Sequence, residues 1–182
     1  DNDDCADALP LTMDGASFDT SGATTDGPVN DLYNQPLPRL CYFGLSDEQV
    51  HKDIWYDVVV PCTSGLRLGL CDSSFDTKIA VYEGSACPRY ESAIACNDDA
   101  CGGEFGRQSE LHLDVHGGDA YKVRIGGFNG DWGVGVLTLD YGPRSQTSLE
   151  DFAAFARCFT GPCETGPCNF SDEPCCSVQD FD

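Results

Sequence analysis

Residues 53–71 read DIWYDVVVPCTSGLRLGLC and contain two strand patterns separated by a turn. The first half, 53–61, is dense in β-branched and aromatic residues and stops at a proline, which is typical of a strand. The second half places leucines at positions 66, 68 and 70, so that they share one face of an extended chain. Both patterns predict strands with a buried face.

Similar patterns continue along the chain, at residues 77–84, 91–96, 109–128 and 133–142. Within 109–128, alternating apolar residues run up to Gly-Gly-Asp at 117–119, and this predicts a hairpin with its turn there. One or two further strands are expected before residue 38. Regular strands with turns between them predict an all-β fold, a β-sandwich or jelly roll, over residues 1–143.

The composition changes after residue 143. Residues 148–159, SLEDFAAFARCF, predict a short helix with Ser148 as its N-cap and the phenylalanines at 152, 155 and 159 on one stripe. The rest is too poor in apolar residues to form a core of its own. We therefore expect residues 144–182 to be a short C-terminal helix plus a disulfide-rich tail that cysteines attach to the sandwich.

The chain of 182 residues contains twelve cysteines and three histidines, and no C-x-x-C pair. This pattern favours six disulfides in an oxidising compartment over a metal site, so we expect a secreted, extracellular or cell-surface protein. The start at Asp1 without an initiator methionine predicts a mature chain whose leader has been removed. The cysteines are Cys5, Cys41, Cys62, Cys71, Cys87, Cys96, Cys101, Cys158, Cys163, Cys168, Cys175 and Cys176.

Seven of these cysteines lie in the predicted sandwich and five in the tail, so complete pairing requires at least one bridge between the two parts. Sequence does not fix the connectivity. The pairings we expect are Cys62 with Cys71 and Cys87 with Cys96, each across a segment that can fold back, and Cys5 with Cys41. Cys101 is then the candidate for the bridge to the tail.

The formal net charge is −21. Nucleic-acid binding needs clustered Lys and Arg, and anionic membranes attract basic segments. We therefore expect neither nucleic acid nor a membrane surface as a partner. No apolar stretch is long enough to insert into a membrane.

Several motifs together resemble the bacterial pre-peptidase C-terminal (PPC) type of β-sandwich, in the cysteine-rich version of planctomycete-like bacteria. They are NDDCADALPL at 2–11, WY at 55–56, FDT at 75–77, VY at 81–82, NDD at 97–99 and YKVRIGG at 121–127. The resemblance covers about residues 1–142 and implies a non-catalytic module of secreted peptidases or surface proteins. The tail resembles the linker between dockerin-like calcium repeats, but it lacks a complete calcium loop.

Two acidic loops form the candidate metal site. Carboxylate and amide oxygens are the ligands that Ca²⁺ prefers, and neighbouring strands can bring two loops together. The candidate ligands are Asp72, Asp76, Asn97, Asp98, Asp99 and Glu104. The alternative is that these residues form turns and bind no ion. Asp1, Asp3 and Asp4 form a second acidic cluster, which we expect to be a solvated terminus.

Aromatic, histidine and asparagine side chains give the remaining candidates. Trp55 is expected in the core, whereas Trp132 lies in a glycine-rich turn where an exposed ring could stack on a sugar. His112, Asp114 and His116 alternate with apolar residues and are expected on the solvent face of a strand. Asn169 begins an N-glycosylation sequon, the candidate site of a glycoprotein.

No hydrolase motif is present, so we expect a protein that is not an enzyme. The first hypothesis is an extracellular structural or assembly module that self-associates into a surface fibre, layer or matrix. The N-terminal residues Leu9, Leu11 and Met13 could add a strand to a neighbouring copy, although an ordinary first strand of the same sandwich is preferred. The alternative is an accessory module of a larger secreted hydrolase that binds carbohydrate or protein, with glycans among its partners.

Overall fold

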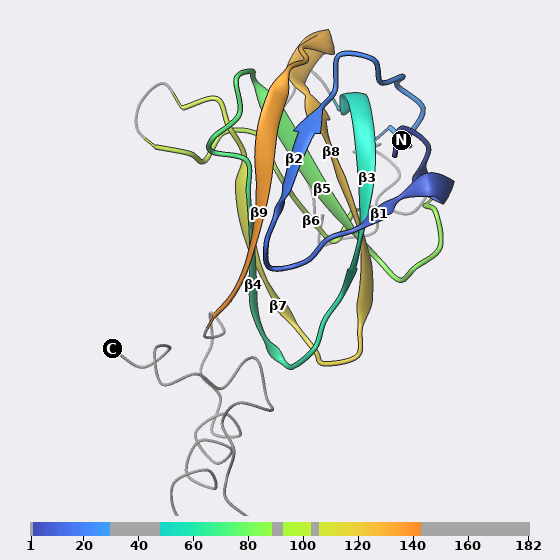
Figure 1. The fold of residues 1–182 in the computed structure, drawn as a ribbon, viewed down its shortest axis with the longest axis vertical. Coiled ribbons are helices and arrows are strands. Elements are labelled where there is room, and N and C mark those ends of the chain that lie inside the picture. The colour runs from blue at the N-terminus through green and yellow to red at the C-terminus, as the bar shows by residue number, and fades with distance from the viewer. Residues whose placement is uncertain (1, 30–47, 89–92, 103–105, 143–182) are drawn as a thin grey trace, which may run out of the picture.

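The computed structural model describes residues 2–29, 48–88, 93–102 and 106–142 (Figure 1). The predicted helix at 148–159, the cysteine-rich tail, Glu104 and Asn169 lie outside these residues. Within the described part, no helix is long and apolar enough to cross a membrane.

Nine strands of the described residues form two sheets (Figure 1). The five-stranded sheet has the order β1 (Leu9–Pro10), β3 (His51–Val59), β8 (Ala120–Gly127), β5 (Thr77–Glu83) and β6 (Ala95–Asn97). The four-stranded sheet has the order β2 (Ala16–Asp19), β9 (Val134–Gly142), β4 (Ser64–Gly69) and β7 (Glu110–Val115). Two short 3₁₀ turns, η1 (Cys5–Asp7) and η2 (Phe128–Gly130), complete the described elements.

The two sheets enclose one hydrophobic core, as in a β-sandwich. The five-stranded sheet contributes Ile54, Val58, Ile79, Val81, Val123 and Ile125, and the four-stranded sheet contributes Phe18, Leu66, Leu68, Leu111, Val115, Leu137 and Leu139. Each set recurs at every second position, because alternate side chains of a strand point to one face. The prediction of an all-β fold is confirmed for the described residues.

The predicted hairpin over 109–128 is wrong. β7 pairs with β4 in one sheet, whereas β8 pairs with β3 and β5 in the other. The Gly-Gly-Asp turn therefore crosses between the sheets, next to the β3–β4 connection that does the same. Two hydrogen bonds join these crossings, from Gly118 N to Val60 O (2.8 Å) and from Val60 N to Asp119 O (2.9 Å).

The N-terminal strand is paired inside its own sheet. Leu9 and Pro10 lie parallel to β3, opposite Tyr56 and Asp57. Leu11 continues from there into the core, while Met13 is exposed. The preferred expectation, a first strand of the same sandwich, is confirmed for this segment.

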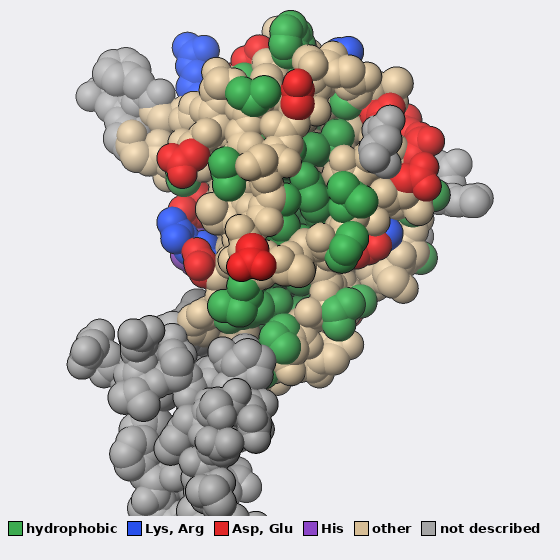
Figure 2. Space-filling view, in the orientation of Figure 1, with side chains coloured by type: hydrophobic (Ala, Val, Ile, Leu, Met, Phe, Trp, Pro, Cys, Tyr) green, Lys and Arg blue, Asp and Glu red, His purple; other side chains and the backbone are tan. Residues whose placement is uncertain are grey.

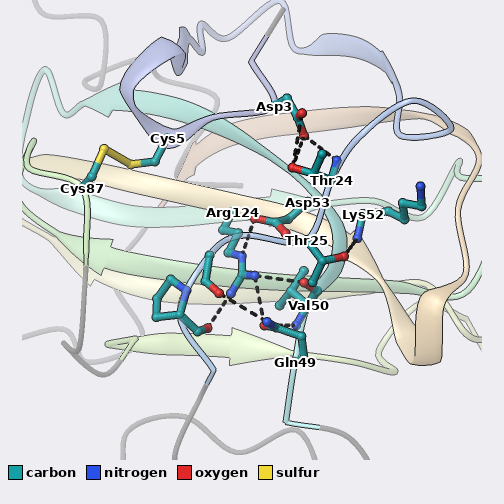
Figure 3. A network of polar contacts seen from close by, with 12 residues as sticks. Asp3, Cys5, Thr24, Thr25, Gln49, Val50, Lys52, Asp53, Cys87 and Arg124 are labelled. Carbon is teal, nitrogen blue, oxygen red and sulfur yellow. Dashed lines mark hydrogen bonds and ion pairs between the residues drawn. A yellow bond between two sulfur atoms is a disulfide. The ribbon is translucent and has the colours of Figure 1, made fainter.

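The outer face of the five-stranded sheet carries buried charges. Arg124 on β8 is 1% exposed and its Nε donates to Asp53 Oδ2 at 2.9 Å (Figure 3). Its two Nη atoms donate to Pro28 O, Val50 O and Gln49 Oε1. The guanidinium also lies over the ring of Trp55, which is 1% exposed as predicted for a core residue.

Residues 2–8, which we call the N-terminal segment, lie against this face. Asn2 Nδ2 donates to Trp55 O, and Trp55 N donates back to Asn2 O, both at 2.8 Å. Lys122 Nζ on β8 reaches both Asp57 (2.8 Å) and Cys5 O (3.3 Å). The segment thus satisfies backbone groups at the edge of β3 and a lysine on the sheet face, which would otherwise be left to water.

The disulfides correct the expected pairings. Cys5 is bonded to Cys87 and Cys71 to Cys101, so the expected pairs Cys5–Cys41, Cys62–Cys71 and Cys87–Cys96 and the tail bridge from Cys101 are wrong. The physical reason is the strand pairing. β6 places Cys96 opposite Ala80 in the middle of β5, whereas Cys87 lies beyond the end of β5. Cys62 and Cys96 each take part in a further disulfide, and not with each other.

Candidate functional site

Three loops meet at one end of the five-stranded sheet. β5 begins at Thr77, which pairs with Gly127 at the end of β8. β6 runs antiparallel to β5 and ends at Asn97, opposite Ile79. The loops before β5, after β6 and after β8 therefore converge, since antiparallel neighbours exchange their starts and ends.

The convergence brings together Asp76, Asp98 and Asp99. Each offers a carboxylate oxygen, and these oxygens all lie within 4.8 Å of one another. Asp76 and Asp98 are half-buried and Asp99 is exposed. Asp76 Oδ1 is buried and has no hydrogen-bond partner among the described residues. Oxygen-only donors at this spacing suit a hard cation such as Ca²⁺.

Asp131 completes the surroundings of Asp76, and sequence reasoning missed it. It follows η2 on the β8–β9 connection. Its Oδ2 accepts from Asp76 N at 3.1 Å, and its Oδ1 accepts from Trp132 N at 3.0 Å. Asp131 therefore joins the carboxylate cluster to the loop that carries Trp132. The only available signal was its position beside the glycine-rich turn.

Negative charge accumulates at the cluster. Burial raises the pKa of Asp76, and the nearby Asp99 and Asp131 carboxylates raise it further. Arg107 and Lys78 oppose this rise; Arg107 Nη1 lies 3.9 Å from Asp76 Oδ2. A cation bound among these carboxylates would relieve both the desolvation and the repulsion.

The other sequence-predicted ligands have different positions. Asp72 is exposed at the start of its loop. Asn97 uses Oδ1 to accept from Glu110 N at 3.1 Å, so this amide is a structural hydrogen-bond acceptor. The Cys71–Cys101 disulfide joins the 71–76 loop to the 98–102 loop, with a Cα–Cα distance of 5.3 Å. The two loops that carry the cluster are thus covalently joined.

Trp132 is exposed, as its glycine-rich turn predicts. The residue is 55% exposed, and Val134 at the start of β9 is 56% exposed. An exposed indole followed by an exposed valine presents an apolar surface directly beside Asp131. Such a ring can stack on the apolar face of a sugar.

The histidines on and after β7 face solvent, in agreement with the prediction. His112 and His116 are exposed, while Leu111 and Val115 are buried on the opposite face. His112 Nε2 lies 3.2 Å from Glu110, and His116 Nδ1 lies 3.7 Å from Asp119. Each imidazole thus contacts a surface carboxylate, as expected for the solvent-facing side of a strand.

Comparisons with known proteins find similarity in solved structures. No protein-family model and no curated protein sequence matches the chain. One similar structure is the pre-peptidase C-terminal domain of a collagenase from Bacillus anthracis (10% identity, TM-score 0.44, covering 73% of this chain and 92% of that one). Another is PliG, a periplasmic inhibitor of g-type lysozyme from Aeromonas hydrophila (14%, TM-score 0.41, 74% and 95%).

A third is the CBM36-1 domain of a multidomain xylanase from the hindgut metagenome of Trinervitermes trinervoides (14%, TM-score 0.31, 72% and 99%). The first of the three is a pre-peptidase C-terminal domain, the kind of domain whose motifs this sequence resembles. Likeness at these TM-scores decides nothing about function, and membership of that family stays a prediction. The function is argued from the side chains.

Proposed function

We propose that this chain is a non-catalytic accessory module of an extracellular protein, and that it binds carbohydrate with the help of Ca²⁺. The observation that carries the proposal is the position of Asp131. One of its carboxylate oxygens holds the backbone of Asp76, and the other holds the backbone of Trp132.

A cation at Asp76, Asp98 and Asp99 would fix the three loops relative to one another. Its ligands come from the loops before β5 and after β6, and Asp131 extends the effect to the β8–β9 loop. Trp132 would then be presented in one orientation, and a rigid aromatic platform loses less conformational entropy on binding than a mobile one. The proposed role of the ion is therefore to preorganise the sugar-binding ring.

The first test is calcium binding. Calorimetry with CaCl₂ after chelator treatment should give one binding event, and the melting temperature should rise because the ligand binds the folded state. Asp76→Asn and Asp99→Asn should lose both effects. Asp72→Asn is the matched control, since it removes one carboxylate from the same loop outside the cluster. If wild-type protein gives neither heat nor a shift, these residues form turns only.

The second test is polysaccharide binding. Affinity electrophoresis in gels containing soluble xylan, mannan or glucan should retard the wild-type protein in CaCl₂ and release it in chelator. Trp132→Ala should abolish retardation, whereas Trp132→Tyr should keep part of it because a ring remains. Equal mobility of all variants in every gel would refute the carbohydrate proposal.

The structural or assembly role stays a prediction, and so do secretion, self-association and glycosylation at Asn169. Disulfides at Cys5, Cys71, Cys87 and Cys101 support an oxidising compartment. The strand proposed for addition to a neighbour is already paired with β3. That pairing makes the accessory role the better supported of the two.

A further inference from the structure

The outer face of the four-stranded sheet continues the surface that begins at Trp132. Along β9, Leu137 and Leu139 point into the core, so the residues at alternate positions, Val134, Val136, Thr138 and Asp140, point outward. From Val134 to Asp140 this row runs for about 20 Å at the usual rise of a strand. Trp132 lies at its beginning.

β4, the neighbour of β9, presents a nearly bare strip. Its buried leucines at 66 and 68 leave Gly65, Arg67 and Gly69 on the outer side. A Cβ at Gly69 would approach Thr138 Oγ1 to 2.9 Å, so a side chain there would collide with β9. Arg67 is thus the one side chain that rises from the outer side of β4.

Arg67 is held by carboxylates on both sides. Its Nη2 bonds Glu110 on β7, and its Nη1 lies 3.4 Å from Asp140 on β9. His112 contacts the other oxygen of Glu110. These contacts place N–H donors and carboxylate acceptors side by side on the outer face.

A hollow of about 670 Å³ opens beside this group. Arg67, Glu110 and Gln108 provide its polar lining, and the Cys71–Cys101 disulfide, Ala100, Gly102 and Gly106 provide the rest. The volume is that of an ordinary small-ligand site. A free anion would meet the Glu110 carboxylate, and a free cation would meet the Arg67 guanidinium. A neutral ligand with many hydroxyls satisfies both, because each hydroxyl can donate to a carboxylate and accept from an N–H.

We infer that this face is an extended binding surface for a neutral polysaccharide, which runs from Trp132 along β9 to the Arg67–Glu110 pair at the hollow. The inference rests on the proposed function and deepens it, since it makes the ligand an internal stretch of a long chain rather than a single terminal sugar. Trp132 supplies stacking at one end, and the charged pair supplies hydrogen bonds at the other.

The test compares a two-sugar and a six-sugar oligosaccharide of the polysaccharide that retards the wild-type protein, by calorimetry in CaCl₂. Arg67→Met and Glu110→Gln keep side-chain volume but remove charge-assisted hydrogen bonds, so each should weaken six-sugar binding about tenfold or more. Neither should change two-sugar binding. Lys52→Met is the matched control, because it also removes one positive charge, from β3 in the other sheet.

The outcomes separate the two proposals. If Arg67→Met and Glu110→Gln bind the six-sugar ligand like wild type while Trp132→Ala does not, the extended surface is refuted and the proposed function stands. If polylysine binds this face and competes with the polysaccharide in wild type but not in Glu110→Gln, the ligand is a basic peptide and the inference is overturned. Far-ultraviolet circular dichroism of each variant checks that the fold is kept.

Discussion

Arg124 and Asp53 show how a buried ion pair is made tolerable. Both side chains are fully buried, and burial of either charge alone would cost several kcal/mol. The guanidinium donates hydrogen bonds to Asp53, Pro28 O, Val50 O and Gln49, so its positive charge is surrounded by oxygen atoms (Figure 3). The pair therefore links β8 and β3 to residues 28 and 49–50, which lie far apart in the sequence.

Breaking this pair should strongly destabilise the folded state. Arg124→Met leaves the Asp53 charge buried without its partner, and we expect a loss of about 3–5 kcal/mol in the free energy of unfolding. Arg67→Met is the matched control, because the Arg67 pairs are exposed and should cost at most about 1 kcal/mol. Urea unfolding under oxidising conditions measures both. Equal losses in the two variants would contradict the role given to burial.

Asp26 makes stability depend on pH. Asp26 is exposed as a residue, but partial desolvation of its carboxyl, a hydrogen bond with Asp4 and the charge of Asp53 raise its pKa from 3.8 to about 6. The folded state therefore binds more protons than the unfolded state between these values, and stability falls as the pH rises through this window.

We expect Asp26→Asn to increase the free energy of unfolding, by an amount that grows with pH. At about pH 4 the wild-type carboxyl is mostly protonated, so the variant should differ little; at about pH 7 it should be the more stable protein. Asp14→Asn is the control for lost charge, because Asp14 is also exposed but is not among the neighbours that act on Asp26. A gain from Asp26→Asn that stays constant over this range would rule out the shifted carboxyl as its cause.

At the scale of elements, strand positions could be predicted and strand partners could not. The alternation at 66, 68 and 70 indicates a buried face, and β4 starts and ends within about two residues of the prediction. Alternation does not say which sheet a strand joins, because both sheets bury the same kind of face in the same core. This is why the alternation over 109–128 predicts one hairpin although its two arms belong to different sheets.

The candidate site shows the same division. Asp76, Asp98 and Asp99 could be predicted to meet, because each lies next to a strand and the two strands are neighbours. The approach of Asp131 to this cluster could not be predicted, since it depends on β8 lying on the other side of β5.

Disulfide partners depend on the same long-range arrangement. With two bridges inside the sandwich, Cys41, Cys62 and Cys96 remain there, an odd number, so a bridge to the tail stays a prediction.

The Cys71–Cys101 bridge should matter for calcium more than Cys5–Cys87 does. It joins the two loops that carry Asp76, Asp98 and Asp99, and its removal frees them to move apart. We expect Cys71→Ser/Cys101→Ser to weaken Ca²⁺ binding about tenfold or more, since ordering the loops then opposes binding. Cys5→Ser/Cys87→Ser is the control, with a bridge lost far from the cluster. Calorimetry measures both affinities, and equal weakening in the two variants would argue against a loop-specific effect.

At the scale of the whole molecule, the surface is strongly acidic. The described residues include six Lys and Arg side chains, and three of them, Lys78, Lys122 and Arg124, are buried. In the face shown in Figure 2, acidic side chains surround a group of hydrophobic ones in the region where β1, β2 and β3 lie in Figure 1. In the described part, only three Lys and Arg side chains therefore remain at the surface to offset the carboxylates there, and the chain as a whole has a formal net charge of −21.

Salt should therefore stabilise the fold. Screening weakens repulsion among surface carboxylates far more than it weakens the buried Arg124–Asp53 pair. The melting temperature in chelator should rise between about 0.05 and 0.5 M NaCl, a range over which the screening length falls severalfold. Scanning calorimetry measures it. A flat or falling melting temperature would show that surface repulsion contributes little.

The Cys5–Cys87 bond has a mechanical consequence. It encloses β1 to β5 in one covalent loop with a sequence separation of 82 residues. A pulling force applied at the amino end would leave the backbone at Cys5, cross the two sulfurs and re-enter at Cys87. Most of the enclosed chain, out of roughly 290 Å in total, could not be extended while the bond lasts. Residues 71–87 would share the tension, because Cys71 inside the loop is bonded to Cys101 outside it. Under load this half of the module is a short, inextensible link, and a reductant would turn it into a long, compliant one.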